Sequence, residues 1–439
     1  MSKELIRLSN CSMAFDDEIV LKNLNLYIND KEFLTLLGPS GCGKTTTLRI
    51  IGGFTTPSSG DVFFDGVRIN DVPPYQRQIN TVFQKYALFP HLNVFENIAF
   101  GLRMKKTPDP ADPSGKRMVK LSEAEISRRV NEMLDIISLR GFEHRKPDAL
   151  SGGQQQRVAI ARTLAPEPQV LFMDEPLSNL DAKLRLEMRY ELQRLHVETG
   201  STFVYVTHDQ MEAMTLSTKI CLMNNGVLQQ YAAPLMLYGA PNNLFCADFV
   251  GNPSINFIEG KGSQQGDGSI ALSVLNGKKA VFTPRKPLNM DEWFAKRDED
   301  TAAAKEAETE LLKEKGSVEK ENKDEVFEYH IAKVDEEDFT LKEKVAVTNE
   351  DFVLAIRPEK IKVTPQGKLD AHVNGSMPTG MESTLKLNVN GFLLTSVVFG
   401  SFAYVIGDEI HIDIDEDGIL LYDRKSGKLI ASGTVDLRD

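Results

Sequence analysis

The nine residues GPSGCGKTT, positions 38 to 46, combine the residue types that a phosphate-binding loop needs. They fit the pattern G-x-x-x-x-G-K-[ST]. The residues before them are typical of a strand and those after them of a helix, which is the context that a phosphate-binding loop requires. Glycines allow backbone amides to face phosphate oxygens, Lys44 would add a cation at the β- and γ-phosphates, and the Thr45 hydroxyl would bind Mg²⁺. The predicted loop residues are Gly38, Pro39, Ser40, Gly41, Cys42, Gly43, Lys44, Thr45 and Thr46.

A second candidate group stands at the end of the apolar run VLFMDEP. Asp174 and Glu175 are adjacent acids at the carboxyl end of a predicted buried strand, where two charges are costly without a cation. Asp174 is therefore expected to hold Mg²⁺ through its water shell, and Glu175 to polarise an attacking water. Together with the loop, this pair predicts a Mg²⁺-nucleotide site that hydrolyses a phosphate bond.

Two further side chains follow predicted strands, in VYVTHD and INTVFQ. His208 could bind the γ-phosphate and position the water, and Gln84 could contact Mg²⁺ or the water. A lone histidine is more often structural, and a glutamine at a strand exit is more often a surface residue. The residues alone leave both alternatives open.

The segment LSGGQQQR, positions 150 to 157, carries no general base and no metal ligand. Ser151 is suited to cap a helix, and Gly152 and Gly153 expose bare amides at its positive end. Read alone, this is a helix start that could receive an anion.

The elements that must position these residues alternate between strands and helices up to about residue 235, which predicts a doubly wound α/β core. Residues 104–120 contain prolines, a glycine and mixed charges, and are expected to form a surface loop or insertion. After GAPNNLF, short alternating strands between Gly, Asn and Asp turns predict a small β-barrel-like domain. Residues 290–325 are rich in Ala, Glu and Lys, and we expect an exposed charged helix or a flexible insertion without chemistry.

The bulk composition excludes several classes of protein. At 439 residues the chain is expected to form two or three domains, and no run approaches the roughly 18 apolar residues of a membrane helix. The start MSKELIRLSN lacks an apolar signal region, so the cytoplasmic side is expected. A net charge of −12 argues against broad nucleic-acid binding. The cysteines lack metal-ligand spacing and are expected to be reduced thiols: Cys11, Cys42, Cys221 and Cys246.

Taken in order, GPSGCGKTT, VFQKYALFPHLNVFENIAFGLR, LSGGQQQRVAIARTL, VLFMDEPLSNLD and VTHD resemble the ATP-binding subunits of ABC transporters. The resemblance covers residues 3 to about 240. It continues in FVGNPSINF, LAIRPEKI and GDEIHIDIDEDGILLYDRKSGKLI, which are similar to the regulatory domain of importer ATPases for sugars and glycerol phosphate. It implies a P-loop ABC domain over 1–240, with a helical subdomain over about 85–155, and an OB/TOBE-like β-barrel regulatory domain over 241–439.

The resemblance also implies roles for single residues. Phe15 would stack on adenine, Gln84 would be the glutamine that links Mg²⁺ to a docking surface, and His208 would be the switch histidine. The residues from Ser178 to Asp181 would form the D-loop, with Asp181 among the residues that bind ATP. The signature residues Ser151, Gly152, Gly153 and Gln154 of one subunit would close over the ATP bound to Lys44 of another.

The implied partners are a second copy of this chain, two membrane-spanning permeases and, indirectly, an extracytoplasmic solute-binding protein. The implied location is the cytoplasmic face of the cell membrane, and the implied cofactors are ATP and Mg²⁺. The tail LLYDRKSGKL favours an importer of sugars, oligosaccharides or glycerol phosphate. NTVFQKYALFPHLNVFENIAFGLRMKK resembles the spermidine/putrescine importer ATPase, which is the alternative. A soluble ABC ATPase acting on DNA or the ribosome is disfavoured, because a second cassette and a long coiled coil are both absent from the sequence.

Overall fold

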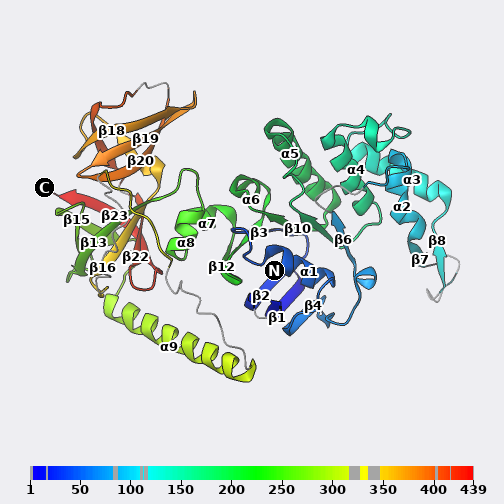
Figure 1. Ribbon diagram of the computed structural model, residues 1–439, viewed down its shortest axis with the longest axis horizontal. Helices are drawn as coiled ribbons and strands as arrows, with labels where there is room; N and C mark the ends of the chain where they lie inside the picture. Colours follow the sequence, from blue (N-terminus) through cyan, green and yellow to red (C-terminus); the bar gives the residue numbers. More distant parts are fainter. Residues whose placement is uncertain are drawn as a thin grey trace. The chain divides into compact units, whose positions relative to one another are not determined.

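The computed structural model describes residues 3–15, 18–82, 88–108, 112, 117–315, 327–334, 347–400, 404–415 and 417–438. The chain divides into two compact units, Met1–Pro234 and Leu235–Asp439 (Figure 1). The predicted boundary between residues 240 and 241 falls near this division. Within the described ranges, no helix combines the length and the apolar character needed to span a bilayer.

The first unit is built on a six-stranded sheet in the order β12-β11-β3-β10-β9-β6. All neighbouring pairs are parallel except β11 and β12, which are antiparallel. Every residue of β3 and β10 is buried, as expected for parallel strands covered on both faces. This sheet confirms the predicted α/β core. Its strands are β3 (Phe33–Leu37), β6 (Ile79–Val82), β9 (Val170–Asp174), β10 (Thr202–Thr207), β11 (Lys219–Asn224) and β12 (Val227–Ala232).

The amino-terminal strands form a separate antiparallel sheet in the order β2-β1-β4-β5. The sequence predicts strands in IVLKNLNLYI and DVFFDG but not their separation from the parallel sheet, because strand periodicity does not reveal which strands pair. Their buried side chains share one core with the helix α1 and with residues of the parallel sheet. The bounds are β1 (Glu4–Phe15), β2 (Glu18–Asn29), β4 (Ser59–Phe64), β5 (Val67–Arg68) and α1 (Lys44–Gly52).

Five helices of the first unit, α2 to α6, begin after a residue whose side chain caps the helix. Ser122 and Ser151 accept hydrogen bonds from the third residue of their helices, which confirms the cap predicted at Ser151. Asn93 and Glu96 form a reciprocal capping box at the start of α2. Gly200 ends α5 with φ of 59°, a left-handed conformation that glycine adopts readily. The helices are α2 (Val94–Met104), α3 (Glu123–Ile136), α4 (Gly152–Leu164), α5 (Ala182–Thr199) and α6 (Gln210–Leu216), with the short helices η1 (Pro74–Gln76) and η2 (Pro147–Ala149).

Residues 104–120 differ from a plain surface loop. The described part contains a two-stranded antiparallel hairpin, β7 (Lys106–Pro108) and β8 (Met118–Lys120). Residues 109–111 and 113–116 of the predicted insertion lie outside the described residues.

His196 makes the stability of the first unit depend on pH. Its ring lies 5.3 Å from the Phe33 ring and 5.2 Å from the Phe203 ring, and burial lowers the pKa of its imidazole. The pKa of His196 in the folded protein lies below its value of about 6.5 in the unfolded chain. The free energy of unfolding that comes from burying the neutral ring is therefore fully present above pH 6.5 and is lost as the pH falls through the folded pKa. Denaturant unfolding at pH 7 and pH 5 should show a larger loss of stability in the wild type than in His196→Phe, which keeps the aromatic packing. Equal losses in both proteins would contradict this assignment.

The second unit contains a closed barrel and a five-stranded sheet, which confirms the predicted β-barrel-like part. The barrel order is β13-β14-β15-β23-β22-β16, and β13 pairs with β16 to close it. The barrel strands are β13 (Asn256–Gln264), β14 (Ile270–Val274), β15 (Lys278–Pro284), β16 (Asp351–Ile356), β22 (Asp417–Asp423) and β23 (Leu429–Arg438). The sheet strands are β17 (Ile361–Val363), β18 (Leu369–Pro378), β19 (Glu382–Val389), β20 (Phe392–Phe399) and β21 (Glu409–Ile414). The other elements are α7 (Pro234–Gly239), α8 (Leu244–Phe249), α9 (Met290–Lys315) and η3 (Pro358–Lys360).

Arg357, in the motif LAIRPEKI, ties two short helices to the barrel. Its guanidinium donates to the Tyr238 carbonyl of α7 at 2.8 Å and to the Ala247 carbonyl of α8 at 3.3 Å. It also lies 4.0 Å from the centre of the Tyr238 ring. One buried cation therefore satisfies carbonyls at the ends of both helices, where helix dipoles favour positive charge.

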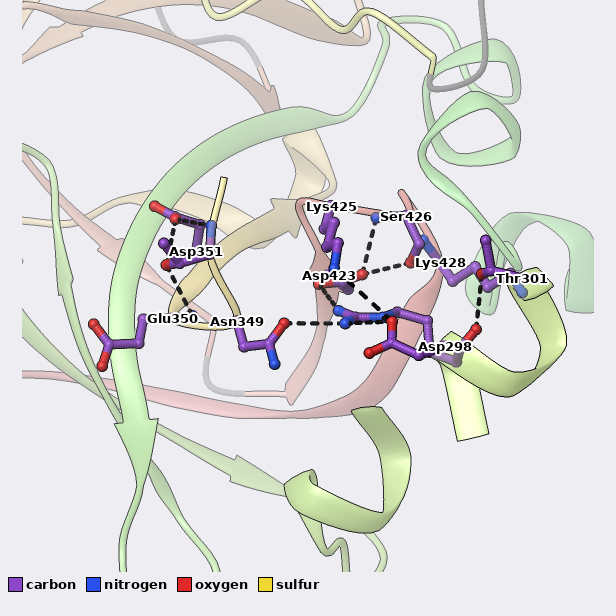
Figure 2. Close-up of polar contacts among 11 residues, drawn as sticks. Asp298, Thr301, Asn349, Glu350, Asp351, Asp423, Lys425, Ser426 and Lys428 are labelled. Atoms are coloured by element: carbon purple, nitrogen blue, oxygen red, sulfur yellow. Dashed lines mark hydrogen bonds and ion pairs between the residues drawn. The ribbon is translucent and has the colours of Figure 1, made fainter. Parts of the chain in front are cut away.

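The predicted charged insertion, residues 290–325, forms helix α9 in its described part, and its first turns are not simply exposed. Met290 and Arg297 are buried against the barrel, with 5% and 3% exposure. Arg297 pairs with the buried Asp423 of β22 at 3.1 Å and donates to Asn349 at 3.0 Å. Figure 2 shows Asp423 and Asn349 among the polar side chains of this region. The charged composition of α9 predicted a helix exposed to solvent on all sides. The sequence did not indicate the burial of Arg297, because its partner Asp423 lies far along the chain. Residues 316–326 lie outside the described residues.

Candidate functional site

The predicted phosphate loop connects β3 to α1 at the carboxyl edge of the parallel sheet. Gly43 has φ of 98°, and a Cβ there would approach Leu21 Cδ2 to 2.5 Å, so only glycine fits without strain. The Lys44 side chain is buried and curls into the loop, where Nζ donates to the Gly38 and Pro39 carbonyls at 2.8 Å each. The cation is therefore held by neutral partners inside a loop of backbone groups.

Helix α1 adds the positive end of its dipole to the same place. It begins at Lys44, directly after the loop, and its cap residue Gly43 offers no side chain to the free amides. Thr47 uses its hydroxyl within the helix, donating to the Gly43 carbonyl at 2.9 Å. Backbone amides at a helix start, next to a buried lysine, are suited to bind phosphate.

Asp174 and Thr45 meet across the edge of the sheet. The Thr45 hydroxyl donates to Asp174 Oδ1 at 3.4 Å, although the residues are 129 positions apart. Burial raises the pKa of the Asp174 carboxyl and the charge of Glu175 raises it further, while the hydrogen bond from Thr45 lowers it. A carboxylate and a hydroxyl are hard oxygen donors that suit Mg²⁺. In the described ranges no cluster of three or more carboxylate, histidine or cysteine groups is placed to hold a metal, so a cation here would take its remaining ligands from water and phosphate.

Glu175 and His208 also come together, from the ends of the neighbouring strands β9 and β10. Glu175 Oε1 lies 3.1 Å from His208 Nδ1, and the Glu175 amide donates to the Val206 carbonyl at 3.0 Å. Glu175 has φ of 46°, a left-handed conformation that costs energy for a residue with a side chain. The His208 ring remains largely exposed. This arrangement places a carboxylate and an imidazole at the same edge as Lys44, where they could act on a water.

The loop after Glu175 leads to Asp181, which caps α5. The Ser178 hydroxyl donates to the Glu175 carbonyl at 2.9 Å, and Asp181 accepts from the Leu184 amide at 2.9 Å. Asp181 is exposed. Its carboxylate thus already has a local structural role within this chain.

The signature segment forms the start of α4. The Ser151 hydroxyl accepts from the Gln154 amide at 3.4 Å, and the Gln154 side chain accepts from the Ser151 amide at 3.0 Å. A Cβ on Gly153 would approach Leu184 Cδ1 to 2.6 Å, so glycine permits close packing against the start of α5. Ser151 and Gly152 are exposed, and among the described residues no hydrogen bond joins this segment to the phosphate loop.

The other two candidates are Phe15 and Gln84. Phe15 ends β1 in the register position opposite Glu18, and 48% of its surface is exposed. An exposed phenylalanine at a strand end is available for stacking on a flat ligand. Gln84 lies outside the described residues.

A buried cluster next to His208 was missed from the sequence. Glu212, in the first turn of the helix after His208, accepts hydrogen bonds from Tyr205 and Thr207. The signal was the spacing T-H-D-x-x-E, in which the glutamate returns to the strand end that carries the histidine.

Comparisons with known proteins show which family this chain is similar to. Residues 21–178 match the family model described as ABC transporter. A spermidine/putrescine import ATP-binding protein of Clostridium acetobutylicum is 39% identical over 417 residues, covering 94% of this chain and 95% of that protein. The protein of the same name from Desulfitobacterium hafniense is 54% identical over 255 residues, covering 58% and 69%. An uncharacterized ABC transporter ATP-binding protein of Escherichia coli O157:H7 is 45% identical over 298 residues, covering 67% and 79%.

The full-length match, the family model and the edge that carries Lys44, Asp174 and Glu175 lead to one conclusion. This chain belongs to the ATP-binding subunits of ABC importers, the ATPases that couple ATP hydrolysis to import across a membrane.

Proposed function

We propose that this chain drives the import of spermidine and putrescine. The observation that carries the proposal is the match to the Clostridium acetobutylicum protein, which extends over 94% of the chain and so includes the second unit. The similar protein from Desulfitobacterium hafniense bears the same name. These relatives favour the polyamine alternative over sugars, oligosaccharides and glycerol phosphate, for which the support was a short carboxy-terminal segment.

The proposed chemistry assigns each step to a group at the edge of the sheet. Lys44 and the amides of Gly38–Thr46 bind the ATP phosphates, and Phe15 stacks on adenine. Thr45 and Asp174 hold Mg²⁺, which neutralises phosphate charge when bound, and Gln84 completes this set. Glu175 accepts a proton from the attacking water, and His208 binds the γ-phosphate and positions that water.

The proposed assembly is a dimer of this chain in which Ser151, Gly152, Gly153, Gln154 and Asp181 of one subunit contact the nucleotide of the other. Ser151 and Gly152 are exposed at the start of α4, and this supports the proposed contact because the positive end of the helix dipole suits an anion bound to another subunit. Loss of the γ-phosphate would remove contacts made only in the closed dimer, which shifts the equilibrium to the open state. We propose domain limits of 1–240, with the helical subdomain at about 85–155, and 241–439.

The proposed partners are two membrane-spanning permeases, with an extracytoplasmic solute-binding protein acting through them. This places the chain at the cytoplasmic face of the cell membrane. The helical subdomain would receive a short helix of the permease. A soluble ABC ATPase is a poorer fit, because the relative that matches the whole chain bears the name of an importer subunit.

The substrate is tested by uptake into cells of the source organism that lack this chain. Re-expression of the wild type should restore uptake of radiolabelled spermidine and putrescine, and Lys44→Ala should not. Maltose and glycerol 3-phosphate uptake, measured in the same strains, serve as controls. Restored uptake of either control compound, with spermidine uptake unchanged, would overturn the polyamine assignment.

A further inference from the structure

Glu212 is a buried carboxylate one turn away from His208, with no nucleotide-binding role assigned to it. It lies in the first turn of α6 and is 3% exposed. Its Oε2 accepts from the Tyr205 hydroxyl at 2.8 Å and from the Thr207 hydroxyl at 2.7 Å. Both donors belong to β10, the strand whose carboxyl end carries His208.

The two residues that flank His208 are joined by the same network. The Thr207 hydroxyl accepts from the Asp209 amide at 2.9 Å while it donates to Glu212. The Asp209 carboxylate caps α6, accepting from the Met211 amide at 2.8 Å, and its other oxygen lies 3.7 Å from Arg185 of α5. The backbone on both sides of His208 is therefore held, while the histidine ring itself stays largely exposed.

A carboxylate holds these hydroxyls more firmly than an amide would, because hydrogen bonds to an ionised acceptor are stronger than those to a neutral one. An ionised carboxylate only accepts hydrogen bonds, so both hydroxyls must point toward Glu212. The Thr207 oxygen then presents its lone pairs to the Asp209 amide, which sets the turn at His208. Burial raises the pKa of the Glu212 carboxyl, and the hydrogen bonds from Thr207 and Tyr205 lower it. A neutral amide would cost less to bury but would hold the Thr207 hydroxyl more weakly, and an apolar group would leave it free to turn.

We propose that Glu212 is a positioning residue for His208, acting through the Thr207 hydroxyl to hold the β10–α6 turn in the geometry that ATP hydrolysis needs. Arg185 connects the β10–α6 turn to the loop before α5. It donates to the Leu180 carbonyl at 3.2 Å and lies 3.7 Å from the Asp209 carboxylate. The inference rests on the proposed role of His208 in hydrolysis. The residues that it adds do not contact the nucleotide but fix the position of the His208 side chain.

The test uses the full-length protein and compares Glu212→Gln, Thr207→Val, Thr207→Ser and Tyr205→Phe. We expect Glu212→Gln and Thr207→Val to lower kcat for ATP about 10- to 100-fold, the cost of a misplaced catalytic group. The KM for ATP should change less than about threefold, since no phosphate contact is lost. Thr207→Ser keeps the hydroxyl and should retain activity. Tyr205→Phe is the matched control, because it removes a hydrogen bond to the same Glu212 oxygen without touching the turn.

Two further measurements separate positioning from general stability. In a His208→Ala background, Glu212→Gln should cause no additional loss of turnover, because the group it positions is gone. The ring NMR signals of His208, assigned by their disappearance in His208→Ala, should shift or split in Glu212→Gln and stay unchanged in Tyr205→Phe.

The outcomes also separate this inference from the role of His208. Unchanged His208 signals in Glu212→Gln, or an equal loss of turnover in both backgrounds, would overturn the positioning role. Full turnover in His208→Ala would instead overturn the role proposed for the histidine, while the NMR signals would still decide whether Glu212 positions it.

Discussion

Glu175→Gln is expected to lower ATP turnover about 100- to 10,000-fold, the range for loss of a general base. Glutamine has nearly the same shape and can still lie beside His208 Nδ1, which Glu175 Oε1 approaches to 3.1 Å. It cannot accept the proton of the attacking water at neutral pH. ATP binding should persist, because Lys44 and the loop amides are unchanged. Single-turnover hydrolysis and equilibrium ATP binding measure the two effects separately.

The matched control for Glu175→Gln is Glu187→Gln, which makes the same replacement of a carboxylate by an amide at an exposed position on α5. Its turnover should equal that of the wild type. If Glu175→Gln hydrolyses ATP at a rate close to that of the control, Glu175 is not the base. Loss of ATP binding in Glu175→Gln would mean that the change damaged the site itself.

The same variant allows the proposed dimer to be tested. With hydrolysis blocked, ATP should hold two copies together, and gel filtration with light scattering should report a dimer only when ATP is present. Adding Ser151→Arg places a bulky cation at the start of α4 and should abolish this dimer while ATP still binds to each subunit. A dimer that persists in the double variant would rule out the contact proposed for the signature segment.

Asp423→Ala is expected to destabilise the second unit by about 3–5 kcal/mol, the usual cost of breaking a buried ion pair. It removes the partner at 3.1 Å from Arg297, which is 3% exposed, and leaves that guanidinium buried with less compensation. It also removes the acceptor of the Ser426 amide (Figure 2). Trp293, the single tryptophan of the chain, lies on α9 next to Arg297, so its fluorescence during denaturant unfolding reports this region.

Two comparisons make this stability prediction specific. Asp417→Ala breaks an exposed pair with Arg285 and should leave the unfolding midpoint almost unchanged. Arg297→Met combined with Asp423→Ala should lose less stability than Asp423→Ala alone, because the unpaired buried charge is gone. An Asp423→Ala midpoint equal to that of the exposed control would show that this pair does not anchor α9.

Much of the candidate site could be predicted because its groups belong to short local patterns. Lys44 and Thr45 follow a glycine-rich turn between a strand and a helix, and Glu175 and His208 each follow an apolar strand. Parallel strands end at one edge of a sheet, so these groups were expected to meet there. Helix starts such as Ser151 were also predictable, since a cap depends on residues three positions apart.

Contacts between distant residues were not predictable, because no periodicity records which oxygen meets which nitrogen. Thr45 and Asp174 are 129 positions apart, and Arg297 and Asp423 are 126 apart. The charged composition of α9 indicated a solvated helix, and only the fold buried Arg297 against the barrel. Likewise, the separate antiparallel sheet depends on strand pairing rather than on strand propensity.

By itself, then, the sequence determined which groups lie at the edge of the sheet, because they are encoded by local spacing around strand ends. The tertiary structure decided how those groups are held: the left-handed turn at Glu175, the hydroxyls that Glu212 orients behind His208, and the buried pair that anchors α9. These features depend on burial and on hydrogen-bond direction, which exist only after the chain has folded.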